Sequence, residues 1–271
     1  MAGLYLPGTS PSPRVKPSAR IAIHTLPPLN FARTGNDLAK MIDHALLSPS
    51  LTQQDLEQGC RMAKAYDIAS VCIMPYYLRR CSDILRGSTV QPSTTIGFPH
   101  GGHATATKAA EARQAIRDGG EELDVVVNIS QVLSRNWDYV TDDIRAVVET
   151  AHEHGKKAKV IFENAYLQNE HKIRLCEIST EIGADWVKTS TGFAASGATL
   201  DDLALMIENV RPPVEVKAAG GIRDLNTLLK TRELGVTRCG ASATAAILDE
   251  ARRQLDLPVI EAPAVSAIGG Y

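Results

Sequence analysis

The stretch WVKTSTGFAASGATLDDLALMIENVRPPVEVKAAGG, residues 186–221, contains one complete unit of the pattern that decides the fold. A short run rich in β-branched residues leads into a turn, a segment with helical periodicity follows, and a second β-branched run closes the unit. The theme recurs from Asp43 onward at intervals of roughly 24 to 36 residues, the length of one βα unit. The runs are MIDHALL (41–47), SVCIMP (70–75), TTIGFP (94–99), ELDVVVN (122–128), AKVIFEN (158–164), WVKTS (186–190), VEVKAAG (214–220) and RCGAS (238–242).

Eight such runs predict an α/β fold, a (β/α)₈ TIM barrel, because eight βα units close naturally into one domain of ~250 residues. A doubly wound open sheet also has near-continuous apolar strands. No G-x-G-x-x-G follows the first run, however, as a dinucleotide-binding sheet would require. Two helices are predicted in detail. Thr52 and Asp55 form a capping box for residues 53–65, and Thr105 to Arg117 is rich in good helix formers.

The first 35 residues differ in composition from the rest of the chain. They contain six prolines and four basic residues, and no acid precedes Asp37. This composition predicts a Pro-rich N-terminal extension, residues 1–35. A transit peptide is also basic and poor in acids, but the prolines oppose the amphipathic helix that it needs. The barrel is expected over residues 36–258, followed by a C-terminal tail, residues 259–271.

The charge balance and the cysteine content limit which partners and which cellular compartment are expected. The chain has 29 basic and 31 acidic residues, so no global basic field favours nucleic acid or a membrane surface as partner. No apolar run approaches the ~18–20 residues that span a bilayer. The five cysteines are odd in number and lack a C-x-x-C motif, which argues against a disulfide framework or a cysteine-rich zinc site. A reducing, cytoplasmic location is therefore expected.

Two lysines interrupt consecutive apolar runs, each just before a glycine-containing loop. Lys188 precedes TSTGF and Lys217 precedes AAGG. In a barrel, both amines would point inward at the carboxyl ends of adjacent strands, where active sites lie. The alternative is that both are strand-end residues that reach solvent, as most lysines do.

A lysine nucleophile at neutral pH needs a pKa about 3 units below its free value of ~10.4, or roughly 4–5 kcal/mol. A second ammonium at ~5 Å, with an effective dielectric of ~20, supplies about 3 kcal/mol. Partial burial in the barrel mouth supplies the rest. One lysine can therefore keep the other neutral, which activates an amine for Schiff-base formation.

Asp124 lies inside the apolar run ELDVVVN and needs a partner if it is buried. Lys217 is the expected partner, and together they could move protons; a purely structural ion pair is the alternative. Glu163 is a second carboxylate in reach. The last two runs end in AAGG and GAS, where barrels often bind phosphate through backbone amides; plain turn glycines are the alternative.

His100 and His103 share the loop FPHGGHAT and could begin a metal site, as in a metal-dependent aldolase. No third ligand follows at a recognisable spacing, so solvent-facing loop residues are expected, and no metal is predicted.

These motifs together resemble the deoxyribose-phosphate aldolase family of class I aldolases. The resemblance covers Met41 to Ser242 in order and rests on the stretches MIDHALLSPSLT, SVCIMPYYL, TIGFPHGGHATATKAAEAR, EELDVVVNI, DWVKTSTGF, SGATLDDLALM, VEVKAAGGIR and TRCGAS. It implies a lyase of deoxyribonucleotide catabolism that reversibly cleaves 2-deoxy-D-ribose 5-phosphate to acetaldehyde and D-glyceraldehyde 3-phosphate without metal or other cofactor.

The resemblance also implies a role for individual residues. Lys188 would be the Schiff-base lysine, Lys217 the lysine that tunes it, and Asp124 the proton-relay carboxylate. The substrate and phosphate contacts would be Gly192, Gly220, Gly221, Gly240, Ala241 and Ser242. Tyr271, after two glycines, could fold over the site as a lid, as some family tails do, or belong to a frayed terminus. A homodimer is expected from the family alone.

Two other functions stay open on the sequence alone. The first is a different phosphosugar barrel enzyme, either an isomerase, which needs a carboxylate base but no imine, or an aldolase of transaldolase type. The second is a non-catalytic sugar-phosphate binding protein on the same fold. The lysine pair argues against an isomerase, and the presence of Lys188, Lys217 and Asp124 together argues against a binding protein.

Overall fold

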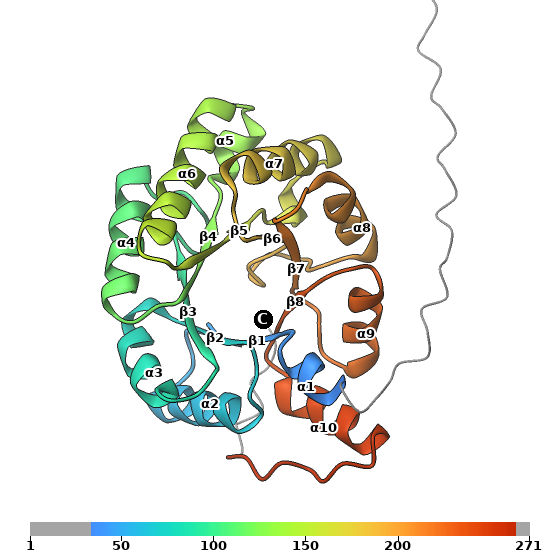
Figure 1. Ribbon diagram of the computed structural model, residues 1–271. Coiled ribbons are helices and arrows are strands. Elements are labelled where there is room, and N and C mark those ends of the chain that lie inside the picture. Colours follow the sequence, from blue (N-terminus) through green and yellow to red (C-terminus); the bar gives the residue numbers. More distant parts are fainter. Residues whose placement is uncertain (1–33, 264–271) are drawn as a thin grey trace, which may run out of the picture. The chain divides into compact units, whose positions relative to one another are not determined.

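The computed structural model describes residues 34–263, and these residues form a closed barrel of parallel strands in the order β1 to β8 (Figure 1). The strands are β1 (Ile42–Leu46), β2 (Ser70–Ile73), β3 (Gln91–Ile96), β4 (Glu122–Val126), β5 (Lys157–Ile161), β6 (Trp186–Lys188), β7 (Glu215–Ala219) and β8 (Arg238–Ala241). The predicted (β/α)₈ fold is confirmed. Residues 1–33 of the predicted Pro-rich extension and Tyr271 lie outside the described residues, and the last two residues of the predicted extension, Thr34 and Gly35, begin α1.

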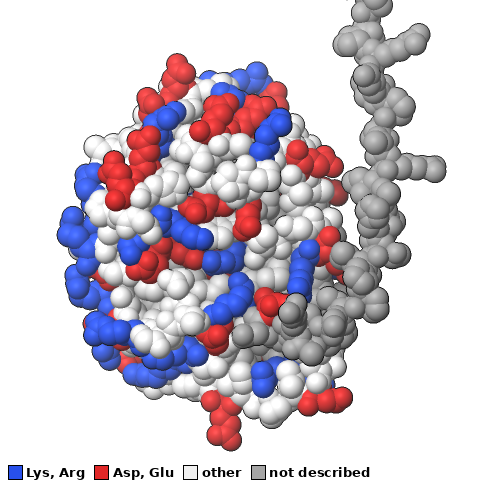
Figure 2. Space-filling model, viewed as in Figure 1, with Lys and Arg blue, Asp and Glu red and all other residues white. Residues whose placement is uncertain are grey.

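The helices form an outer ring around the strands (Figure 1). They are α1 (Thr34–Ala39), α2 (Gln53–Ala65), α3 (Leu78–Leu85), α4 (Thr105–Arg117), α5 (Ile129–Leu133), α6 (Trp137–Glu153), α7 (Asn169–Ile182), α8 (Leu200–Asn209), α9 (Leu225–Glu233) and α10 (Thr244–Gln254), with short 3₁₀ turns at Pro75–Tyr77 and Asn164–Tyr166. No helix among residues 34–263 is both long enough and apolar enough to cross a bilayer. Figure 2 shows lysines, arginines, aspartates and glutamates interspersed on the face in view.

Local sequence explains where several helices begin. At α2 the Thr52 side chain accepts from the Asp55 amide while the Asp55 side chain accepts from the Thr52 amide, so the predicted capping box is confirmed. Thr199 caps α8 and Asp224 caps α9 in the same way, by accepting from the third amide that follows. Both helices follow loops that line the barrel mouth, so these caps fix where those loops end.

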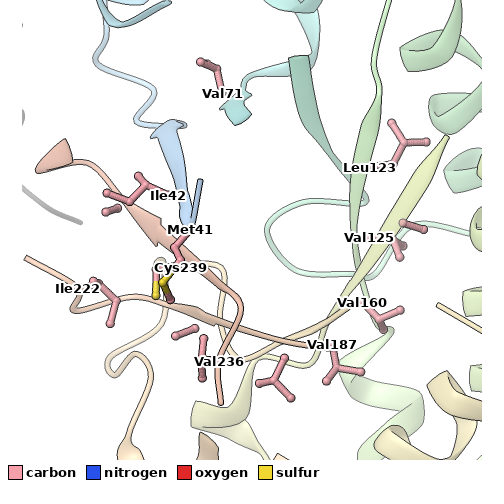
Figure 3. Close-up of a cluster of buried hydrophobic side chains, with 14 of the residues drawn as sticks. Met41, Ile42, Val71, Leu123, Val125, Val160, Val187, Ile222, Val236 and Cys239 are labelled. Atoms are coloured by element: carbon pink, nitrogen blue, oxygen red, sulfur yellow. The ribbon is translucent and has the colours of Figure 1, made fainter. Parts of the chain in front are cut away.

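The strands place apolar side chains outward and charged side chains inward. Leu123, Val125, Val160 and Val187 belong to the buried apolar layer between strands and helices, which also contains Val71 and Cys239 (Figure 3). Because successive strand residues face opposite sides, their neighbours point into the barrel. Those neighbours include Asp124, Lys159 and Lys188, all buried. The interior of this barrel is thus largely ionic.

His44 on β1 faces the other way from Asp43 and is fully buried, with its Nδ1 2.9 Å from the Thr244 hydroxyl at the start of α10. Burial lowers its pKa from 6.5 to about 4, partly offset by a bond with the Ala241 backbone. The folded state therefore keeps His44 neutral over a pH range in which the unfolded chain binds a proton.

For this reason we expect the free energy of unfolding to decrease as the pH is lowered. Between pH 6.5 and about 4 only the unfolded state protonates His44, so the free energy of unfolding drops by about 3 kcal/mol, with no further loss from this group below pH 4. Urea denaturation of the wild type and His44→Gln at several pH values measures it. The difference between the two stability curves should show this slope. His103→Gln, on an exposed loop, is the control; equal slopes in wild type and His44→Gln would contradict the prediction.

Candidate active site

The two lysines that the sequence singles out lie side by side. Lys188 ends β6, and its register partner on β7 is Lys217. The Nζ atoms of Lys188 and Lys217 both donate to Oδ2 of Asp124, at 2.8 and 3.0 Å. Two nitrogens that share one oxygen cannot be further apart than the sum of these lengths. The structure thus brings Lys188, Lys217 and Asp124 together at one point inside the barrel.

Asp124 has a further partner that sequence reasoning missed. Lys159 on β5 donates to the other carboxylate oxygen of Asp124 at 2.8 Å and is itself fully buried. It also lies 2.6 Å from Glu122. Both oxygens of Asp124 are therefore occupied by amines, which fixes the plane of the carboxylate so that Oδ2 faces Lys188 and Lys217.

The ion pairs continue across the barrel to β1 and β8. Lys217 lies 2.5 Å from Asp43, and Arg238 pairs with both Asp43 and Glu122. Trp186 borders this network, with the Lys159 amine 5.7 Å and the Arg238 guanidinium 4.8 Å from its ring. We call the connected set the charged cluster; it consists of Asp43, Glu122, Asp124, Lys159, Lys188, Lys217 and Arg238.

Among the lysines of the charged cluster, Lys188 is the one whose pKa falls. Burial is the largest cause, and the neighbouring Lys217 ammonium also lowers the pKa, while Asp124 raises it only in part. From the sequence, the second lysine was expected to be the larger cause of the lowered pKa, whereas in the structure burial is the main cause. Since the neutral amine is the nucleophile, the lowered pKa of Lys188 is a shift in the direction that imine formation requires.

Lys217 and Asp124 remain ionised. Burial lowers the pKa of Lys217, but Asp124 and Asp43 outweigh it, so the pKa is raised. Burial raises the pKa of Asp124, but Lys159, Lys188 and Lys217 outweigh it and hold the pKa well below its usual range. The two lysines therefore do not lower each other's pKa equally: Lys217 keeps its proton, and Lys188 loses its proton more readily.

The charge count of the cluster agrees with this division. Four of its members are cationic when protonated and three are anionic, so full ionisation leaves one positive charge in excess. Loss of a proton from Lys188 makes the cluster neutral. Since an unpaired buried charge is costly, the surrounding network itself favours a neutral Lys188.

A pocket opens above these lysines at the carboxyl ends of the strands. Lys188 and Lys217 line it with Cys72, Ala45 and Leu47. Every residue predicted to contact substrate or phosphate also lines it, namely Gly192, Gly220, Gly221, Gly240, Ala241 and Ser242. The exposed side chain of Arg223 lines the same pocket and was not singled out by the sequence.

The glycine loops have a geometry that other residues would disturb. Gly220 and Gly221 have φ of 81° and 87°, in the left-handed region that favours glycine. A Cβ on Gly220 would lie 2.8 Å from Cα of Gly197 in the loop after β6, so the two loops pack backbone to backbone. The helix α10 begins at Thr244, and Ala243, its N-cap, joins it to the GAS segment. Backbone amides at a helix N-terminus suit an anion.

The residues that sequence reasoning missed share one signal. Each is a charged residue at an inward-facing strand position, next in sequence to an outward-facing apolar residue; they are Asp43, Lys159 and Arg238. The same alternation that drew attention to Lys188 and Lys217 would have found them. Arg223 gives no such signal, because it lies in a loop.

His100 and His103 are exposed loop residues, as predicted. Among residues 34–263, no group of three or more His, Cys, Asp or Glu side chains is arranged to hold a metal ion.

Comparison with known proteins agrees with the fold and identifies the family. The chain is 62% identical over 234 residues to a deoxyribose-phosphate aldolase of Rhodopirellula baltica, which covers 86% of this chain and 97% of that protein. It is 44% identical over 220 residues to that of Thermococcus gammatolerans, with 80% and 98% covered. A solved structure, the tetrameric deoxyribose phosphate aldolase from Aeropyrum pernix, matches with a TM-score of 0.74 and 30% identity, covering 82% of this chain and 93% of that one.

An eight-stranded βα barrel with amines and a carboxylate buried beneath its mouth has the architecture of a (β/α)₈-barrel enzyme. The sequence pattern of the DeoC/LacD family of aldolases matches residues 38–247, and the chain belongs to that family.

Proposed function

We propose that this chain is a class I aldolase that reversibly cleaves 2-deoxy-D-ribose 5-phosphate to acetaldehyde and D-glyceraldehyde 3-phosphate. The observation that carries the proposal is the buried Lys188 amine, with its lowered pKa, next to a charged Lys217 that shares Asp124 with it. The relatives named deoxyribose-phosphate aldolase support this choice of substrate.

Imine formation begins with the Lys188 amine, which attacks the C1 aldehyde carbon of the open-chain sugar. The nitrogen loses a proton, the carbonyl oxygen gains protons and leaves as water, and a protonated imine remains. Lys217, which shares Oδ2 of Asp124 with Lys188, can supply these protons, and Asp124 helps to keep it charged.

Cleavage then uses the imine as an electron sink. A base removes the proton from the C3 hydroxyl, the C2–C3 bond breaks, and its electron pair moves through C2–C1 to the imine nitrogen. D-Glyceraldehyde 3-phosphate leaves, and C2 of the remaining enamine takes up a proton. Water then adds to the imine and releases acetaldehyde from Lys188. We assign these proton transfers to Lys217 and Asp124, because both border the Lys188 amine within the charged cluster.

The phosphate is assigned to the glycine loops at the pocket rim. Gly192, Gly220, Gly221, Gly240, Ala241 and Ser242 offer backbone amides and one hydroxyl, and Arg223 adds a positive charge. These contacts lie at or just beyond the carboxyl ends of β6, β7 and β8, in the pocket that Lys188 also lines, so a sugar phosphate held there can place its aldehyde end toward Lys188.

Borohydride trapping tests the proposal. Incubation with deoxyribose 5-phosphate and sodium borohydride should leave a reduced, covalent adduct on Lys188, because reduction converts the imine to a stable secondary amine. Peptide mass spectrometry locates the adduct. Lys188→Met and substrate-free enzyme are the controls. An adduct on Lys217 instead, or none under conditions of turnover, would refute the assignment of Lys188.

We further propose a cytoplasmic homodimer. The five cysteines are all free and buried, which supports a reducing compartment. The tetrameric Aeropyrum relative supports self-association. Light scattering after gel filtration measures the mass directly; a monomer of 29.2 kDa at micromolar concentration would contradict the dimer.

A further inference from the structure

Glu163, just after β5, is a buried carboxylate outside the charged cluster. Its side chain is 2% exposed, and its backbone has φ 59° and ψ 63°, the left-handed region that non-glycine residues seldom adopt. A buried carboxylate in a strained backbone is costly on both counts. Such an arrangement is kept only where surrounding contacts stabilise it, so the contacts of the Glu163 carboxylate must offset these costs.

The contacts of Glu163 converge on one residue, Thr191. The Thr191 amide donates to both carboxylate oxygens at 3.3 Å, and the Thr191 hydroxyl donates to one of them in a short bond. Next to Glu163, the Asn164 amide donates to the Thr189 carbonyl at 2.9 Å. The segment after β5 therefore fixes the segment after β6 through side-chain and backbone bonds.

Thr191 passes this constraint across Gly192. Its hydroxyl oxygen also accepts from the Phe193 amide at 3.0 Å, so Thr191 and Phe193 are tied together around the glycine between them. Gly192 has φ 94° and lines the pocket beside Lys188. The Phe193 ring packs edge-on against Phe98 of the loop after β3, with ring centroids 5.3 Å apart. Glu163 thus anchors one end of the rim segment, residues 191–193.

Burial raises the pKa of Glu163, and the hydrogen bonds from the hydroxyl and the amide of Thr191 offset part of that rise. Oε2 of Glu163 accepts from both the amide and the hydroxyl of Thr191, and Oε1 also accepts from the amide. An amide in its place would keep one acceptor oxygen but lose the second acceptor and the negative charge.

We propose that Glu163 is a positioning residue that fixes the rim segment and thereby aims the Gly192 amide at the phosphate of the substrate. This rests on the proposed function, in which Gly192 belongs to the phosphate contacts. Glu163 acts through Thr191 and does not take part in the chemistry at Lys188, so its removal should weaken recognition of the phosphate selectively.

The test compares a phosphorylated with an unphosphorylated substrate. For Glu163→Ala, KM for deoxyribose 5-phosphate should rise about tenfold to a hundredfold, the worth of a charge-assisted hydrogen bond. kcat/KM for 2-deoxyribose should change less than about twofold, because that sugar makes no phosphate contact. Glu163→Gln keeps one acceptor oxygen and should fall between the wild type and Glu163→Ala.

A double-mutant cycle with Thr191→Val tests the route of the effect. This substitution removes the hydroxyl and keeps the shape, so the double variant Glu163→Ala/Thr191→Val should be little worse than Glu163→Ala alone. Glu170→Ala, at an exposed carboxylate on α7, is the matched control and should leave both substrates unaffected. Thermal denaturation of each variant confirms that it is folded.

Two outcomes would overturn the proposal. An equal loss with both substrates would show a general structural role, and unchanged kinetics would show that the carboxylate is idle. If the wild type does not cleave deoxyribose 5-phosphate, the proposed function fails instead. The anchor is then tested by calorimetric titration with inorganic phosphate, which Glu163→Ala should bind more weakly than the wild type; equal binding would reject it.

Discussion

Replacing Lys188 with methionine is expected to lower kcat/KM for deoxyribose 5-phosphate by about 10⁴-fold or more. Methionine approximates the length of the lysine stem but has no amine, so the imine cannot form. Stability should change little or increase, because a buried amine with a lowered pKa is replaced by an apolar side chain in the same space. A coupled assay of glyceraldehyde 3-phosphate release and urea denaturation measure the two effects.

The matched control is Lys230→Met, which removes an exposed lysine from α9. It should retain wild-type turnover. If Lys188→Met kept more than about one per cent of the wild-type activity, the amine could not be the covalent centre, because no other group would replace it at that level.

Replacing Asp124 with asparagine should have the next largest effect. Three lysine amines lose their shared anion, so we expect unfolding to cost about 3 kcal/mol less and kcat/KM to fall by about 10³-fold as proton transfer fails. Removal of Asp124 also takes away the carboxylate that raises the pKa of Lys188. The acid limb of the pH profile of kcat/KM should therefore move to lower pH.

That shift separates a catalytic from a purely structural role. A variant that had only lost stability would keep the position of the wild-type acid limb, and such a result would count against Asp124 as the group that tunes Lys188. Asp138→Asn, at an exposed aspartate of α6, provides the control for loss of a single carboxylate.

The strand pattern could be predicted because each run combines an apolar outward row with a turn at its end. The main error was at β3, which begins at Gln91 and not at Thr94. Pro92, which cannot donate to a strand ladder, lies inside this strand. In the structure the Glu121 amide donates to the Pro92 carbonyl at 2.8 Å, and the strand continues through the proline.

The site could be predicted only in part. Lys188, Lys217 and Asp124 stand out because each is a charge within an apolar run, and the structure brings them together. The direction of each pKa shift depends on which side chains from β1, β4 and β5 reach each amine, and a linear sequence does not show those distances. The bonds between Glu163 and Thr191 join residues 28 positions apart, and the left-handed backbone that permits them has no signature in a glutamate.

The inward-facing and outward-facing residues of the strands also separate catalytic reactivity from fold stability. The side chains that set reactivity project to one side of each strand, and the apolar layer that contributes most to cohesion projects to the other. Substitution of inward-facing residues can therefore change substrate specificity while the apolar layer between strands and helices stays unchanged. Breaking the buried ion pairs of the charged cluster would destabilise the fold, so a mutant library should be restricted to inward positions outside that cluster. Such a library should retain a high proportion of folded members, and the same scaffold can acquire new substrates in small steps.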